Sequence, residues 1–351
     1  MKHKGIFFRT VLPAIGILML IFDSRTALEG MTEGIEICVK TVIPSLFPFF
    51  VLSILLTGSM GNKGIPFLKP LGKLCGVPEG AEGLLLLGFL GGYPVGAQAV
   101  TQAWSEGRLT AKQSRRLLGF CSNCGPAFLF GIVGKLFSSK KVLWLLWGIH
   151  ILGALLTGCL LPDKEASGCS SVQRDPPDLS DALNRGIRIM ASVCGWIVLT
   201  KCFLAFADHW VFHGLPQLLC VTVSGLLELA NGCILLGTVK EEPVRFLLVS
   251  GLLSFGGFCV YLQTVSVTGE LGTGWYFQGK LLHMCFGFSM AALLFPLLYN
   301  QPVPFWPFPL TAVCFICFLT KGKKGLAFFR RLVYNQRKNN RSVVYAVPEE
   351  S

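Results

Sequence analysis

The sequence predicts an all-α fold, a polytopic transmembrane helix bundle with two repeat-related re-entrant hairpins. Hydrophobic residues make up 52% and charged residues 14% of the 351 residues, which is more apolar surface than one soluble core of this length would hide. Apolar runs of about 20 residues, enough to span a bilayer as helix, recur along the chain. Two further runs, 84–100 and 246–266, are interrupted by glycine pairs in corresponding positions of two halves, as in repeat-built transporters.

The uninterrupted runs are expected to be helices, because backbone N–H and C=O groups cannot stay unpaired in hydrocarbon. The first run follows Lys2 and Lys4 and could be a signal peptide. It lacks a clean small-residue cleavage site, so we interpret it as an uncleaved first span. The predicted spans are 6–22, 41–60, 117–137, 142–161, 187–207, 215–239, 275–298 and 304–320.

A stretch rich in serine and proline, 162–181, is predicted to be a linker loop between two membrane halves, 1–161 and 182–320. The remainder, 321–351, is predicted to be a basic cytoplasmic tail. The net charge of +12 lies mainly at span ends and in this tail, so we expect the lipid bilayer as the partner and no nucleic acid. The number of apolar runs predicts a protein that crosses the membrane several times.

The two interrupted runs resemble each other. Residues 91–100 align with 256–265 at both glycines, with an aromatic residue after each pair and a glutamine at the same offset. Basic residues flank 84–100 on both sides, which predicts that this run enters and leaves on one side of the membrane. The flanks of 246–266 leave its sidedness open, so the halves could be inverted or parallel. The predicted hairpin tips are Gly91, Gly92, Tyr93 and Pro94 in the first half and Gly256 and Gly257 in the second.

Polar residues within spans are candidates for binding a solute, because an unpaired polar group is costly in lipid. Gln98 and Gln263 follow the two glycine pairs, and their amides offer both donors and acceptors. The alternative is that each amide forms a helix-to-helix hydrogen bond that only holds the bundle together.

A second candidate is the polar segment around Asn123, inside the run 117–137. Pro126 removes a helix hydrogen bond and Gly125 loosens the turn, so carbonyl groups could be freed to face a cavity. The alternative is a proline kink whose polar groups are satisfied by neighbouring helices.

Glu228 is the most conspicuous acidic residue within an apolar run. Its carboxylate could bind a coupling ion, Na⁺ or a proton, and Asn231 would lie about one helical turn away on the same face. The alternative is a structural ion pair with Lys201 or Lys280.

No pattern points to catalysis. The C-x-x-C pairs Cys121/Cys124 and Cys314/Cys317 lack the ligand number of a zinc site, and the histidines show no metalloprotease spacing. No nucleophile elbow, Walker loop or dinucleotide fingerprint occurs. We expect no enzyme, no catalytic residue, no metal and no cofactor, and mostly free thiols.

Five segments occur in the following order: Pro44-Ser45-Leu46-Phe47-Pro48-Phe49-Phe50, Gly91-Gly92-Tyr93-Pro94-Val95-Gly96-Ala97, Asn123-Cys124-Gly125-Pro126-Ala127-Phe128, Gly225-Leu226-Leu227-Glu228, and Gly256-Gly257 with Gln263. In this order they resemble the YlbJ-type sporulation integral membrane proteins of the nucleoside recognition, or Gate, family. The resemblance covers roughly 30–300 and implies an inner-membrane protein of an endospore-forming bacterium, with a domain similar to parts of nucleoside transporters. It implies no particular substrate.

Together these features predict a transporter-like protein that moves a small polar solute and is associated with sporulation. Gln98, Asn123, Glu228 and Gln263 would line the path. The alternative is a non-transporting membrane scaffold required for assembly of the spore cortex or coat. Substrate, coupling ion and association into a homo-oligomer stay open at this point.

Overall fold

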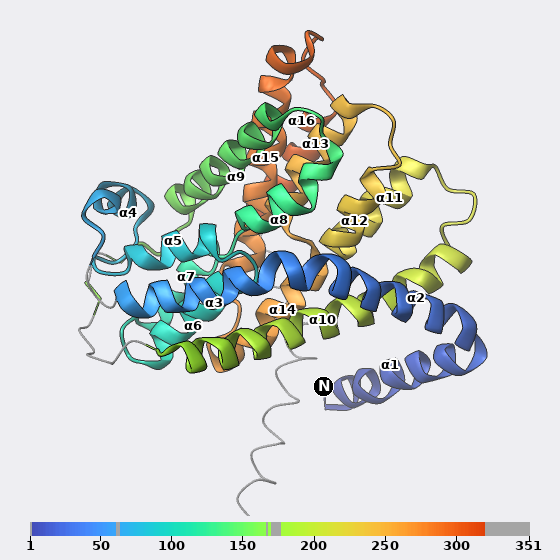
Figure 1. The fold of residues 1–351 in the computed structure, drawn as a ribbon, viewed down its shortest axis with the longest axis horizontal. Coiled ribbons are helices and arrows are strands. Elements are labelled where there is room, and N and C mark those ends of the chain that lie inside the picture. The colour runs from blue at the N-terminus through green and yellow to red at the C-terminus, as the bar shows by residue number, and fades with distance from the viewer. Residues whose placement is uncertain (1, 61–63, 166–167, 170–176, 320–351) are drawn as a thin grey trace, which may run out of the picture.

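A computed structural model describes residues 2–60, 64–165, 168–169 and 177–319, and every regular element in these ranges is helical. The predicted tail 321–351 and part of the predicted linker lie outside the described residues. The helices shown in Figure 1 are α1 Lys2–Phe22, α2 Ser24–Ile37, η1 Cys38–Val42, α3 Ile43–Met60, η2 Pro66–Leu68, α4 Lys69–Cys75, α5 Glu82–Leu90, α6 Val95–Ser105, α7 Ala111–Leu117, α8 Pro126–Gly131, η3 Val133–Leu136, α9 Lys140–Leu160, α10 Leu179–Trp210, α11 Gln217–Leu227, α12 Leu229–Leu236, α13 Glu242–Phe255, α14 Gly257–Thr268, η4 Gly269–Leu271, α15 Tyr276–Tyr299 and α16 Pro307–Leu319.

Two long helical rods run side by side across the molecule (Figure 1). One consists of α2 and α3 joined through the π-helix η1, and the other is α10. Gly30 and Gly34 allow the close approach: a Cβ on Gly30 would lie 2.5 Å from that of Ala205, and one on Gly34 would lie 2.9 Å from Cα of Val198. This small-xxx-small spacing is typical of helix pairs in membranes. Helix α2 lies outside the predicted spans, because charged residues interrupt its apolar sequence.

Helices α5 and α6 fold back on each other at residues 91–94, hereafter tip 1. A Cβ on Gly96 would lie 3.0 Å from Cα of Gly88, although residues eight apart in one helix are separated by about 12 Å. The predicted turn in 84–100 is therefore present.

Helices α11 and α12 also fold back, which corrects the prediction of one continuous span over 215–239. A Cβ on Gly232 would lie 2.1 Å from Cα of Gly225, whereas residues seven apart in a straight helix are about 10 Å apart. Glu228 is extended at this turn, with φ −138° and ψ 114°, and it is called tip 2 below. Apolar composition alone did not reveal the turn, because two packed glycines and a capping carboxylate produce it.

Two helices are broken rather than folded back. Between α7 and α8 the chain is non-helical over 118–125, called break 1, as the proline and glycine there predict. Between α13 and α14, Gly256 and Gly257 both adopt φ +85° and form break 2. The predicted hairpin at 246–266 is not confirmed: α13 packs mainly against α15 and α9, whereas α14 packs mainly against α6 and α10, and both helices also contact α11 and α12.

The described helices include five stretches long and apolar enough to cross a membrane, judged by length and composition. Many large apolar side chains on their outer faces are exposed, a pattern that soluble monomers avoid and lipid would cover. The stretches are Ser24–Leu56, Lys140–Leu160, Leu179–Trp210, Glu242–Leu271 and Tyr276–Tyr299, and exposed residues include Leu28, Ile35, Trp144, Leu199, Phe203, Leu293 and Leu297.

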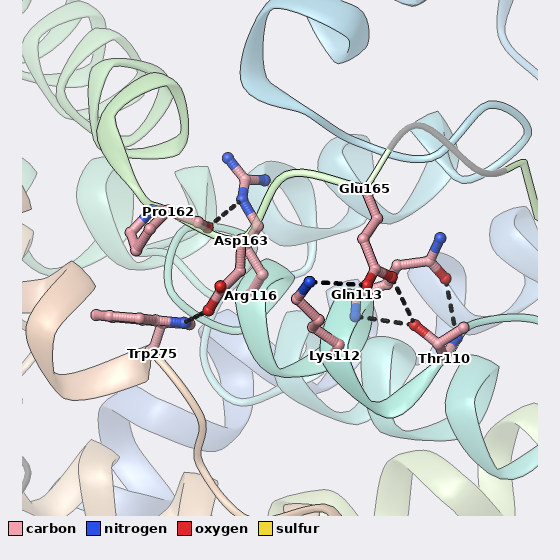
Figure 2. A network of polar contacts seen from close by, with 8 residues as sticks. All are labelled: Thr110, Lys112, Gln113, Arg116, Pro162, Asp163, Glu165 and Trp275. Atoms are coloured by element: carbon pink, nitrogen blue, oxygen red, sulfur yellow. Dashed lines mark hydrogen bonds and ion pairs between the residues drawn. The ribbon is translucent and has the colours of Figure 1, made fainter.

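The described start of the predicted linker is held firmly against α7 (Figure 2). The buried guanidinium of Arg116 donates to backbone carbonyls of Gly76, Gly158, Leu161 and Pro162. Beside it, Lys112 pairs with Glu165 at 3.0 Å, and Trp275 Nε1 donates to Asp163 at 3.0 Å. The hydrogen bond to Glu165 holds the pKa of Lys112 above its usual value. Residues 161–165 thus tie the end of α9 to α7 and to the start of α15.

Candidate functional site

Both tips and both breaks meet in the interior of the bundle. Tip 1 lies on break 1, since a Cβ on Gly125 would be 3.0 Å from Cα of Gly92. Tip 2 lies on break 2, since a Cβ on Gly257 would be 3.4 Å from the backbone N of Leu229. Tyr93 of tip 1 also reaches break 2: its ring would lie 2.9 Å from a Cβ on Gly256. Four interruptions of helix, far apart in sequence, therefore share one region.

A small buried pocket of about 40 Å³ lies where these segments meet. That volume has room for about three water-sized groups. Its polar side-chain groups come from Glu228, Gln263 and Tyr93, while the rest of the lining is apolar or backbone. The lining residues are Val42, Leu46, Gly92, Tyr93, Cys124, Gly125, Phe128, Val193, Ile197, Glu228, Leu229, Ala230, Val260 and Gln263.

The carboxylate of Glu228 accepts hydrogen bonds from the backbone N–H groups of Ala230, at 3.1 Å, and Asn231. It therefore caps the N-terminus of α12, where a negative charge is favoured by the helix dipole. The side chain is 2% exposed. The same capping interaction therefore helps to end α11 at the turn and holds the Glu228 carboxylate at the pocket.

Asn231 connects tip 2 to the long rods. Its Oδ1 accepts a hydrogen bond from Lys201 on α10 at 3.1 Å, and Lys201 forms an ion pair with Glu33 on α2 at 2.7 Å. Glu33 is 66% exposed, whereas Lys201 is 8% exposed. The predicted alternative, an ion pair between Glu228 and Lys201 or Lys280, does not occur among the described residues, because Lys201 pairs with Glu33 instead.

Replacing Glu228 by alanine is expected to lower the free energy of unfolding by about 2 kcal/mol, because two buried N–H groups at the start of α12 would lose their acceptor. Glu228→Gln keeps an amide oxygen and is expected to lose less. Thermal unfolding of the purified variants in one detergent checks the order. Equal stabilities of Glu228→Ala and wild type would contradict the capping role.

Lys280 lies beside the pocket, on α15, and is 1% exposed. Its Nζ donates to Tyr93 Oη of tip 1 at 3.1 Å and to Asn123 Oδ1 of break 1 at 3.1 Å. It also lies over the rings of Tyr93 and Tyr276, 4.9 Å and 5.7 Å from their centroids. Since Tyr93 Oη donates to the carbonyl of Leu253 at 3.2 Å, these groups link tip 1 to the second half of the chain.

The structure thus brings together some of the predicted site residues. Gly92, Tyr93, Gly125, Glu228 and Gln263 line the pocket, and the Nε2 of Gln263 donates to Cys259 Sγ at 3.4 Å. Asn123 and Asn231 are buried but do not line the pocket. Asn123 accepts a hydrogen bond from Lys280, and Asn231 accepts one from Lys201.

The others lie outside the pocket lining. Gln98 is partly buried on α6, and its Oε1 has no hydrogen-bond partner among the described residues. Gly91 and Pro94 complete tip 1, and Pro126 starts α8 after Gly125, as predicted. The role of Lys280 was missed, although a lysine inside the apolar run 275–298 is the kind of residue that signals a site in membranes.

The described residues contain no disulfide and no group of side chains suited to hold a metal ion. Among the residues whose side chains are described, the cysteines are free and no group of three potential ligands could hold a metal ion. Cys314 and Cys317, the second C-x-x-C pair, lie in α16, where their side chains are outside the description.

A second pocket, of about 440 Å³, is lined mainly by α10 and α14, with one residue each from α11 and α15. Its surface is apolar, so it suits lipid tails and not a polar solute. It is lined by Trp196, Leu199, Thr200, Phe203, Leu204, Leu227, Phe258, Cys259, Tyr261, Leu262 and Phe277.

The sequence is 26% identical over 334 residues to the sporulation integral membrane protein YlbJ of Bacillus subtilis (strain 168), and the match covers 80% of each chain. No family model matches the sequence, and no solved structure matches it significantly. The similarity confirms the predicted resemblance to YlbJ-type sporulation integral membrane proteins. It agrees with the apolar helices in indicating a multi-pass integral membrane protein.

Proposed function

We propose that this chain, similar to a sporulation integral membrane protein, is a transporter that carries a small polar solute across the inner membrane of a spore-forming bacterium. The observation that carries the proposal is the meeting of two hairpin tips and two broken helices around one buried pocket with a carboxylate and an amide. Broken helices near the middle of a membrane supply transporters with backbone groups for solutes and ions.

The order of elements supports the proposal further. In the first half, the long rod α2–α3 is followed by the fold-back pair α5–α6, then by the broken helix α7–α8, and then by the straight helix α9. The same order recurs as α10, α11–α12, α13–α14 and α15. We infer a duplication in which tip 1 corresponds to tip 2 and break 1 to break 2. In this register Gly91 and Gly92 correspond to the region of Glu228 and not to Gly256 and Gly257, and both fold-back pairs are re-entrant.

The pocket limits what can be bound in this conformation. Its volume of about 40 Å³ holds an ion or a few water-sized groups and not a nucleoside. A larger solute therefore requires tip 1 or tip 2 to move away from the pocket. We assign Glu228 to a coupling cation or to a solute donor group, and Gln263 to a polar group of the solute.

The test begins with a thermal-shift screen of the purified protein against uridine, adenosine, glutamate and succinate, because a ligand that binds the folded state raises its stability. Uptake of the radiolabelled hit is then measured in liposomes that contain the protein. Glu228→Gln and Gln263→Ala are each expected to reduce uptake at least about tenfold, which is the effect of losing about 1.4 kcal/mol of binding or transition-state stabilisation.

Glu79→Gln is the matched control, since Glu79 is an exposed carboxylate in an ion pair with Lys69, remote from the pocket lining. It is expected to transport as wild type does. Sporulation of a strain with Glu228→Gln as its sole copy separates transport from a scaffold role: normal spores, with the variant inserted at wild-type levels, would contradict transport through this pocket.

A further inference from the structure

The amino group of Lys280 is buried without an acidic partner. No carboxylate among the described residues lies within ion-pair distance of it, and its acceptors are the hydroxyl of Tyr93 and the amide oxygen of Asn123. An ammonium taken out of water into such a site loses hydration that two neutral acceptors and ring faces only partly replace. The other buried lysine, Lys201, differs in having the carboxylate of Glu33 at 2.7 Å.

The groups that hold Lys280 are also those that hold tip 1 closed. Tyr93 belongs to tip 1, accepts from Lys280 and donates to Leu253 of α13. Displacement of tip 1 would break both hydrogen bonds of Tyr93 and admit water to the amino group. Opening of tip 1 and hydration of Lys280 are therefore the same structural event.

We propose that Lys280 is a proton-dependent gate, in which proton uptake on its amino group opens tip 1 and proton release closes it. The amine lone pair takes one proton from water to form the ammonium, and closure returns that proton to water. A group that binds a proton more readily in the open form shifts the equilibrium toward that form as the pH falls. The gate rests on the contacts of tip 1 and needs no assumption about the solute.

Within the described part of the chain, six titratable side chains surround Lys280. Tip 1 contributes Tyr93, break 1 contributes Cys121 and Cys124, α9 contributes His150, and α15 itself contributes Tyr276 and His283. From α13, the uncharged residues Ser250, Gly251 and Ser254 pack against Gly287 and Phe288 of α15. A charged residue of α13 that contacts α15 is Glu242, which accepts a hydrogen bond from Tyr299 at the C-terminal end of α15. His150 Nε2 accepts from the backbone N–H of Cys124 at 3.0 Å, so in this closed form that nitrogen carries no proton.

Hydrogen–deuterium exchange of the full chain in lipid nanodiscs tests the gate. Exchange of the amides in 91–97 is measured from pH 6 to pH 9 and divided by the intrinsic rate of an unfolded reference peptide. In wild type the corrected rate is expected to rise as the pH falls, by up to about tenfold per pH unit for one proton. Lys280→Met, which cannot gain charge, is expected to stay closed with no pH dependence. Lys280→Arg, which is always charged, is expected to be open throughout.

Lys69→Met is the control, because Lys69 is an exposed lysine paired with Glu79 away from tip 1, and it is expected to behave as wild type. Wild-type exchange in 91–97 that is independent of pH would overturn the proposal, as would an unchanged pH dependence in Lys280→Met. If Lys280→Met does not fold, the pH dependence of wild-type exchange and the open state expected of Lys280→Arg still test the gate. Because exchange is read without any solute, failure of the gate is distinguishable from failure of transport.

Discussion

Replacing Gly232 by alanine is expected to cost about 3 kcal/mol or more in the free energy of unfolding, because the new methyl group would meet the backbone of the opposing helix. A Cβ on Gly232 would lie 2.1 Å from Cα and 2.7 Å from N of Gly225. Backbone atoms cannot swing aside as a side chain can, so α11 and α12 would have to separate. Thermal unfolding and the fraction of protein eluting as a single species in detergent measure the loss.

Gly195→Ala on α10 is the matched control, since no atom lies within 4 Å of a Cβ at that position. Alanine is also a better helix former than glycine, so this variant is expected to be at least as stable as wild type. A Gly232→Ala protein with wild-type stability would mean that α11 and α12 are not folded back, and tip 2 would then not exist.

Replacing Arg116 by methionine is expected to cost about 3 kcal/mol or more. The guanidinium is 1% exposed and donates to four backbone carbonyls, those of Gly76, Gly158, Leu161 and Pro162. Methionine fills part of the volume but leaves buried acceptors without donors, at about 1–3 kcal/mol for each group that water cannot reach. The measurement is again thermal unfolding in detergent, together with limited proteolysis at 161–165.

Arg116→Lys is expected to recover only part of this loss, because an ammonium cannot direct donors to carbonyls in a fork as a guanidinium does. Lys112→Met on the same helix is the control: it removes the exposed ion pair with Glu165 and is expected to change stability little. A loss in Lys112→Met as large as that in Arg116→Met would show that charge, not carbonyl binding, secures this segment.

Long apolar helices were predictable because the bilayer and the helix have fixed dimensions. The runs 142–161, 187–207 and 275–298 correspond to α9, α10 and α15 within a few residues at most ends, although α10 begins at Leu179. The turn at residues 91–94 was also predictable, since glycine and proline impose local backbone conformations whatever surrounds them. The same holds for the break before Pro126.

The turn at Glu228 was not predictable from local sequence. The segment Gly225-Leu226-Leu227-Glu228-Leu229 looks like continuous helix, and it turns because Gly225 meets Gly232 and the carboxylate caps α12. Conversely, Gly256 and Gly257 looked like a second hairpin tip but form a break, since the main partners of α13 are α15 and α9 and those of α14 are α6 and α10. The alignment of the two glycine pairs therefore matched a fold-back tip, residues 91–94, with a helix break at Gly256 and Gly257.

The sequence by itself determined that this chain is a helical protein of the membrane, with a turn and a break in its first half and a polar set that includes Glu228 and Gln263. Those features depend on composition, span length and the local backbone preferences of glycine and proline. Only the tertiary structure decided that Glu228 ends a fold-back pair, that Gln263 shares its pocket, and that Lys280 holds tip 1. The reason is physical: each of these features depends on which helices pack together, and no local pattern encodes that. Lys280 and Tyr93, for example, lie 187 positions apart in the chain.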